Sequence, residues 1–515
     1  MTSHATAHGG IAVPARHPTL CAASVILASM LYSIDWTIAS VALPNMRGAF
    51  SATQDQISWV ITSYIVASAI AMPTGGFLSA RYGRRRVFIF AVAGFLASSV
   101  LCGLADSLAF EVVARVLQGI SGAYLVPLSQ AIILDTYPPE KHTSAMGWWG
   151  VGSVLGPVIG PTLGGYLTEY SNWRWIFFIN VPVGVFALLG VILFLPETKR
   201  EPGKPLDWTG FLALALGAGA LQMMLDRGER HDWFESAEIL AEAALAALGF
   251  YLFVAHSLTT KRPFLDPRLL AVRGFALGLA FVFLYGLLTV PPMILMPPLM
   301  QDLRGMTVDT IGLLQSPRGL GLVVSMFLGG SLTHVLGPRL LIGAGFGCLA
   351  VACWEMSSWT VQVGTWPILW TGLVQGFGAG IIWVPLQSVV FPYLAPAQRT
   401  EAAAVLNLVR SVASSIGVSV MLTLFTRTAT EARAQLVEHL TPLQDAFRSG
   451  AAQGYDLSTL QGLAQAQRQV ELQAAMLAYN ADFRLLAAGA LLALPLLVLV
   501  RRPPKPAGPL AAAAE

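Results

Sequence analysis

Asp35 is a lone carboxylic acid inside a long apolar stretch. It lies in the segment LYSIDWTIASVALP (31–44), and the apolar run that begins near Leu20 carries no other charge. A charged side chain in the hydrocarbon core of a membrane is costly, so it is expected to face a cavity or a partner. Burial raises the pKa of a carboxyl and a nearby cation lowers it, so an acid exposed to each side in turn can bind and release protons. We predict a proton-coupling role for Asp35, with a structural carboxylate held by a donor as the alternative.

Arg115 is the candidate counter-charge for Asp35. The residues at helical spacing on its face are Arg115, Gln118, Gly119 and Gly122. Glycines on such a face let a neighbouring helix approach closely. A buried cation needs partners whatever its task, so a purely structural arginine is an equal alternative. Glu111, one turn earlier, is expected to extend toward the outer interface of the membrane.

A third group combines glycines four residues apart with prolines. Its members are Gly152, Gly156, Pro157, Gly160, Pro161, Gly164 and Gly165. Glycines at this spacing form a groove that accepts another helix at backbone distance. Each proline removes a backbone hydrogen bond and bends the helix. We therefore predict a tight, kinked helix–helix seam, and a generic small-residue packing face is the alternative.

Membrane helices must position all of these residues. The chain has 515 residues, of which 55% are hydrophobic and only 11% charged, and this composition excludes an ordinary soluble enzyme. One crossing of a bilayer takes about 20 mostly apolar residues. The sequence predicts fourteen such helices, near 19–43, 57–79, 87–105, 109–133, 146–168, 175–195, 208–225, 238–258, 274–297, 309–332, 338–357, 365–390, 401–425 and 481–500.

Charges in the loops predict the orientation of the chain. Lys and Arg gather after the second, sixth and eighth predicted helices and at the end of the chain, and short cytoplasmic loops collect these residues. Both termini, residues 1–18 and 501–515, are therefore expected in the cytoplasm. The long segment 427–480 is expected outside, where residues 460–477 form an amphipathic helix. That helix either caps the outer opening or contacts an adaptor, and a solvated covering helix is equally compatible.

Two sequence segments recur in the second half of the chain. GGFLSARYGRRR (75–86) returns as GGSLTHVLGPRL (329–340), and VLQGISGAYLVPLSQ (116–130) returns as LVQGFGAGIIWVPLQS (373–388). Both matches give a shift of eight helices. They predict two parallel six-helix bundles, 19–200 and 263–500, with the helix pair of 201–262 inserted between them. Such halves enclose a cavity and alternate its access by rocking, as transporters do.

The chain resembles the major facilitator superfamily, and within it the fourteen-helix drug:proton antiporters of the EmrB/QacA kind. The segments SIDWTIASVALP, RVLQGISGA, GPVIGPTLGGYL and NWRWIFFINVPVG carry the resemblance, which extends from about residue 20 to 500. The segment LDRGERHDWFESAEI (225–239) is similar to the EmrB branch. The resemblance implies proton transfer by Asp35 and Arg115, and an antiporter motif at 152–165 that seals the bundle interface. It also implies a proton-driven multidrug exporter of the bacterial inner membrane that needs no cofactor.

The same resemblance implies partners. These are a periplasmic membrane-fusion adaptor and an outer-membrane channel, of the EmrA and TolC kinds. The matched cytoplasmic gating loop comprises Gly76, Arg81, Gly83 and Arg85. This chain has Ala80 where the family usually has an aspartate, so the usual latch between helices is not expected to form. The arginines then serve at least as topology anchors.

Polar and aromatic residues of several helices are candidates for the substrate cavity. They are Trp36, Gln118, Tyr124, Tyr285, Gln315, Arg318, Gln375, Trp383, Gln387, Asn407 and Arg410. Flat rings with few fixed donors suit varied amphipathic, often cationic compounds. Hydrogen bonding between helices is an equal alternative for the polar members. An exporter of a siderophore, a lipid or an endogenous metabolite would have nearly the same sequence.

Other classes of protein find little support. The sequence has no Walker lysine loop and no zinc-protease pattern, and no basic patch suited to nucleic acid. The four cysteines are not spaced as metal ligands would be, and a disulfide framework is not expected. An intramembrane enzyme would need paired acids or a nucleophile with its base, and no companion acid is expected at the depth of Asp35.

Overall fold

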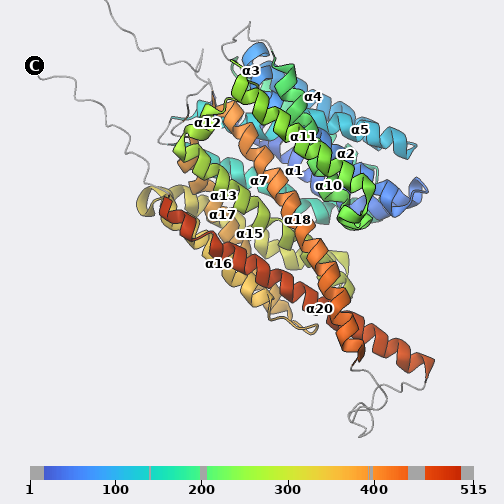
Figure 1. The fold of residues 1–515 in the computed structure, drawn as a ribbon. Helices are drawn as coiled ribbons and strands as arrows, with labels where there is room; N and C mark the ends of the chain where they lie inside the picture. Colours follow the sequence, from blue (N-terminus) through green and yellow to red (C-terminus); the bar gives the residue numbers. More distant parts are fainter. Residues whose placement is uncertain are drawn as a thin grey trace, which may run out of the picture.

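The computed structural model describes residues 17–138, 141–197, 206–261, 263–391, 394, 398–438 and 459–499, and these residues form helices without a strand (Figure 1). The first bundle contains α1 Pro18–Ala49, α2 Gln54–Ala71, the 3-10 turn Met72–Thr74, α3 Gly75–Tyr82, α4 Arg84–Gly103, α5 Leu108–Gly122, α6 Leu125–Thr136, α7 His142–Tyr170, α8 Trp175–Phe178 and α9 Asn180–Phe194.

The second bundle follows an inserted pair, α10 Trp208–Arg227 and α11 Ala237–Thr259. It contains α12 Arg268–Ala271, α13 Arg273–Thr289, α14 Pro291–Pro298, a π-helical turn Leu299–Leu303, α15 Val308–Leu336, α16 Pro338–Met356, α17 Thr365–Val390, α18 Arg399–Glu438, α20 Leu460–Leu492 and the 3-10 turn Pro495–Leu499. The helix predicted over 274–297 is thus divided where Pro291 and Pro292 interrupt its hydrogen bonds.

Thirteen helical segments of the described residues are long and apolar enough to cross a membrane. A further helix, α7, has 29 residues, and several of its side chains lie outside the described residues. The protein is therefore a multi-pass membrane protein. The count of fourteen crossings and the cytoplasmic position of both termini stay predictions.

The last two long helices extend well beyond the predicted crossings. Helix α18 runs for 40 residues to Glu438, and α20 begins at Leu460 and continues into the final crossing. Most of the segment predicted as a loop over 427–480 is therefore helical, because residues 427–438 contain neither proline nor glycine to end α18. The amphipathic helix predicted at 460–477 is present as the first half of α20. The end of α18 and the beginning of α20 project from the rest of the molecule (Figure 1).

The two bundles repeat individual contacts as well as sequence. Gly83 and Gly337 have φ of 89° and 81° and separate successive helices at matching positions. Only glycine adopts such a conformation without strain. The close helix crossings also correspond, since Gly119 lies against the backbone oxygen of Tyr64, and Gly376 lies against that of Arg318. The two halves thus repeat the same close contacts between helices as well as the same sequence segments.

The inserted pair contacts both bundles. Asp226 at the end of α10 accepts a hydrogen bond from Thr62 of α2, while Gln222 of α10 donates to Ser415 of α18 at 2.8 Å. The two inserted helices cross closely at Gly217 and Gly249. Figure 1 shows α10 and α11 lying together along one side of the molecule, next to α2 and α18.

Candidate functional site

Asp35 and Arg115 form an ion pair in the first bundle. Nη1 of Arg115 lies 2.6 Å from Oδ2 of Asp35, and both side chains are 0% exposed. The other carboxylate oxygen accepts hydrogen bonds from Nε2 of Gln118 at 2.8 Å and from Nδ2 of Asn180 at 2.9 Å. Three N–H groups from α5 and α9 therefore bond to the Asp35 carboxylate.

Arg115 has several neighbours besides Asp35. Its Nε donates to the backbone oxygen of Val60 at 3.0 Å, and Nη1 also donates to Gln118 at 2.7 Å. The guanidinium lies over the ring of Tyr64, 4.3 Å from its centroid, a favourable cation–π geometry. Its Nη2, although buried, has no hydrogen-bond partner among the described residues. The arginine is thus held on three sides, and one donor group is left unused.

Two residues of this network differ from their predicted places. Gln118, a candidate for the substrate cavity, instead bridges Asp35 and Arg115 and also donates to Ser99 at 2.7 Å. Asn180 was not among the candidate residues. It lies in the segment NWRWIFFINVPVG, and a lone amide inside an apolar helix is the signal that could have indicated it.

Glu111 contradicts two expectations. Its side chain does not extend to the outer interface, because the residue is fully buried and faces into the bundle. Neither of its carboxylate oxygens has a hydrogen-bond partner among the described residues. Glu111 lies one helical turn before Arg115, so Asp35 does have a companion acid at similar depth. Helix α5 presents both residues on its buried face, and sequence spacing alone could not show how that face is turned.

The glycine seam of α7 packs on α1. A Cβ at Gly156 would lie 2.6 Å from Cβ of Ser33, and a Cβ at Gly164 would lie 2.8 Å from Ile38. Gly152 and Gly160 are equally close to α1. The predicted tight seam is therefore present, and its partner is the helix that carries Asp35. The side chains of Pro157 and Pro161 lie outside the described residues, Gly165 is half-buried, and the predicted kink stays a prediction.

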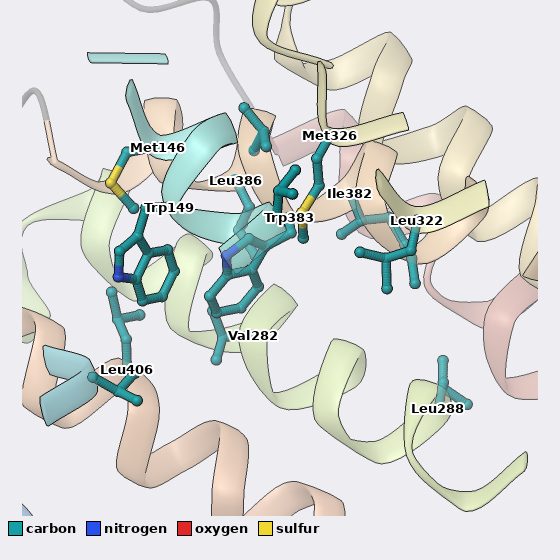
Figure 2. Packing of buried hydrophobic residues seen from close by; sticks show 14 of the residues in the cluster. Met146, Trp149, Val282, Leu288, Leu322, Met326, Ile382, Trp383, Leu386 and Leu406 are labelled. Atoms are coloured by element: carbon teal, nitrogen blue, oxygen red, sulfur yellow. The ribbon is translucent and has the colours of Figure 1, made fainter. Parts of the chain in front are cut away.

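A cavity of about 150 Å³ lies between the two bundles. Its lining residues are Tyr32, Ser33, Val126, Trp149, Gly150, Ser153, Tyr285, Met326, Trp383, Asn407 and Arg410. Figure 2 shows Trp149 of α7 and Trp383 of α17 in one cluster with residues of α13, α15 and α18. Four predicted cavity residues are among the lining: Tyr285, Trp383, Asn407 and Arg410.

The remaining predicted cavity residues are not part of this lining, and most of them bond to other helices. Gln375 donates toward the thiol of Cys353, Arg318 donates to the backbone oxygen of Thr289 at 2.7 Å, and the Tyr124 hydroxyl lies 2.9 Å from that of Thr74. Gln387 is buried and Gln315 half-buried, while the side chain of Trp36 lies outside the described residues. Gln375 and Arg318 thus make hydrogen bonds between helices, which was the alternative for the polar candidates, and Tyr124 makes one as well.

Arg410 gives the cavity its charge. The guanidinium lies 5.8 Å from the centroid of the Trp383 ring, and no carboxylate is present among the lining residues. The opposite wall consists of aromatic rings and hydroxyl groups from α1 and α7. This arrangement is a mostly apolar pocket with one positive group at its edge.

An ionic latch joins the two bundles at one end of the molecule. Asp135, in the last turn of α6, pairs with Arg84 at the start of α4 and with Arg399 at the start of α18, the latter at 2.8 Å. Close by, Gly76 lies against the backbone of Glu401, at 3.4 Å for a built Cβ. This contact differs from the usual latch, for which the aspartate at position 80 is missing, because its acid comes from another helix.

The predicted gating-loop arginines have smaller roles in this contact. Arg81 is exposed beside the rings of Phe77 and Tyr82. Arg85 donates to the backbone oxygen of Ile192 at 2.6 Å and so ties the loop to α9 of the same bundle. Gly83 provides the turn, and Gly76 the close approach to the second bundle.

The sequence matches the Major Facilitator Superfamily over residues 25–418. The chain belongs to this superfamily. Multidrug export protein EmrB of Escherichia coli (strain K12) is 34% identical over 447 residues, which is 86% of each chain. Fatty acid resistance protein FarB of Neisseria gonorrhoeae is 34% identical over 435 residues, 83% of this chain and 85% of that protein. The resemblance to the EmrB kind is therefore confirmed.

Solved structures confirm the major facilitator fold. The human organic anion transporter MFSD10 has a TM-score of 0.61 at 19% identity and covers 93% of this chain and 99% of its own. The proton:xylose symporter XylE has a TM-score of 0.58 at 15% identity, with 92% and 94% covered. As a member of this superfamily the protein is a membrane transporter rather than an enzyme.

Proposed function

We propose that the protein is a proton-coupled exporter of amphipathic compounds in the inner membrane of a bacterium. The buried pair of Asp35 and Arg115 carries this proposal, because a charged pair without contact to solvent is costly and is retained where it performs a task. The identity to EmrB supports the export of drug-like molecules. We expect that the proton gradient alone drives the cycle.

The ion pair is physically linked to the cavity. Tyr32 lines the cavity and lies 5.7 Å from Tyr64, ring centroid to centroid. Tyr64 in turn supports the guanidinium of Arg115. Protonation of Asp35 would remove the attraction that holds α1 to α5, and a change in that packing would reach the cavity through the two tyrosines. Binding of substrate would act on Asp35 by the same route.

The latch indicates which state of the cycle this is. Asp135, Arg84 and Arg399 lie at the end that the loop charges predict to be cytoplasmic. Asn407 of α18 also donates to Gln130 of α6 at 2.7 Å, further inside the same half of the interface. We infer a state whose cytoplasmic end is closed. Alternating access would then require these bonds between the bundles to break and re-form.

A second candidate substrate class is favoured by Arg410. A cation at the edge of an apolar pocket attracts carboxylates and sulfonates and repels ammonium groups. We infer a preference for amphipathic anions or neutral compounds over the cations expected from the sequence. A relative named as a fatty acid resistance protein is consistent with this class. An aromatic sulfonate tests it, since Arg410→Gln should lower its transport while Arg427→Gln, outside the cavity on the same helix, should not.

We also propose an adaptor and an outer-membrane channel as partners, on the likeness to EmrB. The projecting ends of α18 and α20 are the surface that we expect to meet the adaptor. Deletion of residues 440–470 would then preserve uptake by inverted vesicles but abolish resistance in intact cells. Loss of both activities would refute a docking role for this segment.

Purified protein in liposomes with an internal pH dye tests the central proposal. Addition of ethidium, or of anilinonaphthalene sulfonate as the anionic probe, should produce proton flux in the wild type. Asp35→Asn should bind the probe and lack the flux. Equal flux in the two proteins would remove Asp35 from the proton path, and absence of flux with both probes in the wild type would contradict antiport.

A further inference from the structure

Glu111 is a buried acid that the mechanism above does not use. It lies in the first turn of α5 and is 0% exposed, and both carboxylate oxygens lack a hydrogen-bond partner among the described residues. It is not needed as a cap, because the Ser107 side chain already accepts the hydrogen bond from the Phe110 N–H. An ionised carboxylate left without donors in such a place would be very costly.

Several titratable or charged groups surround Glu111. They are Arg115 on its own helix, Asp35 on α1, Cys102 at the end of α4, Arg174 before α8 and, on α2 beneath Arg115, Tyr64. Arg174 is part-exposed and bonds to the backbone oxygen of Ala105. The buried group therefore contains two carboxyls and one guanidinium, and it is neutral only when one carboxyl carries a proton.

The hydrogen bonds indicate which of the two carboxyls, Asp35 or Glu111, carries the proton. Asp35 accepts bonds from three N–H groups, and this favours its charged form. Glu111 accepts no bond from an N–H group, and the Cys102 thiol beside it is only a weak donor, so the proton belongs on Glu111 while Asp35 is paired. Arg115 lies one helical turn from Glu111, and its Nη2 group has no hydrogen-bond partner among the described residues. The Arg115 guanidinium can therefore pair first with one of the two carboxylates and then with the other.

We propose that Glu111 is a second proton-binding carboxyl, through which protons from the outer face reach Asp35. The proposal rests on the proton-coupled function proposed above. Helix α5 starts at Leu108, next to the exposed Asp106 and to Arg174, at the end predicted to face outward. Glu111 thus lies between that surface and the ion pair.

The transfer conserves protons and charge. The O–H bond of protonated Glu111 breaks and an O–H bond forms on the Asp35 carboxylate, directly or through a water molecule. Arg115 keeps its protons and its charge. Its guanidinium exchanges the carboxylate of Asp35 for that of Glu111, which becomes charged as Asp35 becomes neutral. A proton from the outer solution then restores Glu111.

Infrared difference spectra of the purified full-length protein, recorded across a pH step, test whether Glu111 holds a proton. The wild type should show the carbonyl band of a protonated, dry carboxylic acid. Glu111→Gln should lose this band, while Asp106→Asn, which removes an exposed acid of the preceding loop, should retain it. Persistence of the band in Glu111→Gln would overturn the proposal.

Proton flux in liposomes, with the two probes named above, tests the relay. Glu111→Gln should bind the probes normally but lower the flux roughly tenfold or more at neutral outer pH, and Glu111→Asp should recover part of it. Unchanged flux in Glu111→Gln beside active wild type would overturn the relay and leave the antiport intact. Absence of flux in the wild type itself would overturn the antiport and the relay together.

Thermal unfolding separates the relay from a structural role. Removal of an unsatisfied buried acid should leave the stability of Glu111→Gln and Glu111→Leu equal or higher. A marked fall in melting temperature in both variants, with an unchanged pH profile of the flux, would indicate a structural acid at the helix start and would overturn the proposal.

Discussion

The Asp135 carboxylate of the first bundle accepts a 2.8 Å bond from the Arg399 guanidinium of the second. The same carboxylate pairs with Arg84 of its own bundle. The side chains are only 9 to 17% exposed, so solvent screens the attraction weakly. One acid therefore bridges two cations and joins the bundles at the end that we infer to be cytoplasmic.

Asp135→Asn should open this end. The change removes the carboxylate that Arg84 and Arg399 share, and loss of one partner of a largely buried pair costs about 1–3 kcal/mol or more. The population with the cytoplasmic end open should rise tenfold or more, which spin labels on the two bundles would measure as a longer distance. Arg86→Gln is the control, since its 3.8 Å contact with Glu197 is more exposed and lies within the first bundle. Equal distances in wild type and Asp135→Asn would contradict the latch.

Gly156→Ala should disturb α1 and with it the ion pair. The new methyl group would lie within 2.7 Å of Ser33 and of the Ile34 nitrogen, so α1 must move away, at a cost of about 1–3 kcal/mol. Proton flux should fall strongly, while the yield of folded protein should change less. Gly48→Ala near the end of α1 is the control, because nothing lies within 4 Å of its added atom. Full activity in Gly156→Ala would show that the seam tolerates separation.

Asn180→Ala should change the pH dependence of transport. It removes one of the three donors that favour the charged form of Asp35. Transport that depends on Asp35 should therefore respond to pH differently from transport by the wild type. Asn480→Ala is a matched control, because this amide bonds at the same 2.9 Å to a backbone oxygen in the second bundle. The same pH profile in both variants would exclude Asn180 from the proton site.

Gly337→Ala should destabilise the second bundle through backbone strain alone. Gly337 has φ of +81° with nothing within 4 Å of an added Cβ, so no clash contributes. The expected loss is about 1–2 kcal/mol, visible as a lower melting temperature in detergent. Gly347→Ala on α16 also meets nothing within 4 Å and should be neutral or stabilising by up to about 1 kcal/mol. An equal effect of the two changes would refute the strain argument.

Local sequence patterns determined much of this protein. Runs of apolar residues indicated the membrane helices, because the bilayer imposes their length and composition on each segment separately. A lone acid within such a run identified Asp35, and the motif around Arg115 identified its partner. The four-residue spacing of glycines predicted a close seam, and two repeated segments predicted the pair of bundles. Each of these signals can be recognised in short stretches of sequence, without knowledge of how the helices pack.

Contacts between distant helices were decided only by the tertiary structure. Asn180 reaches Asp35 from α9, Asp135 of α6 pairs with Arg399 of the second bundle, and Glu111 turns inward beside Arg115. The cavity likewise takes residues from both bundles and leaves out Gln375 and Arg318. The physical reason is that helical periodicity states which residues share a face, while the rotation and crossing of packed helices decide what that face meets.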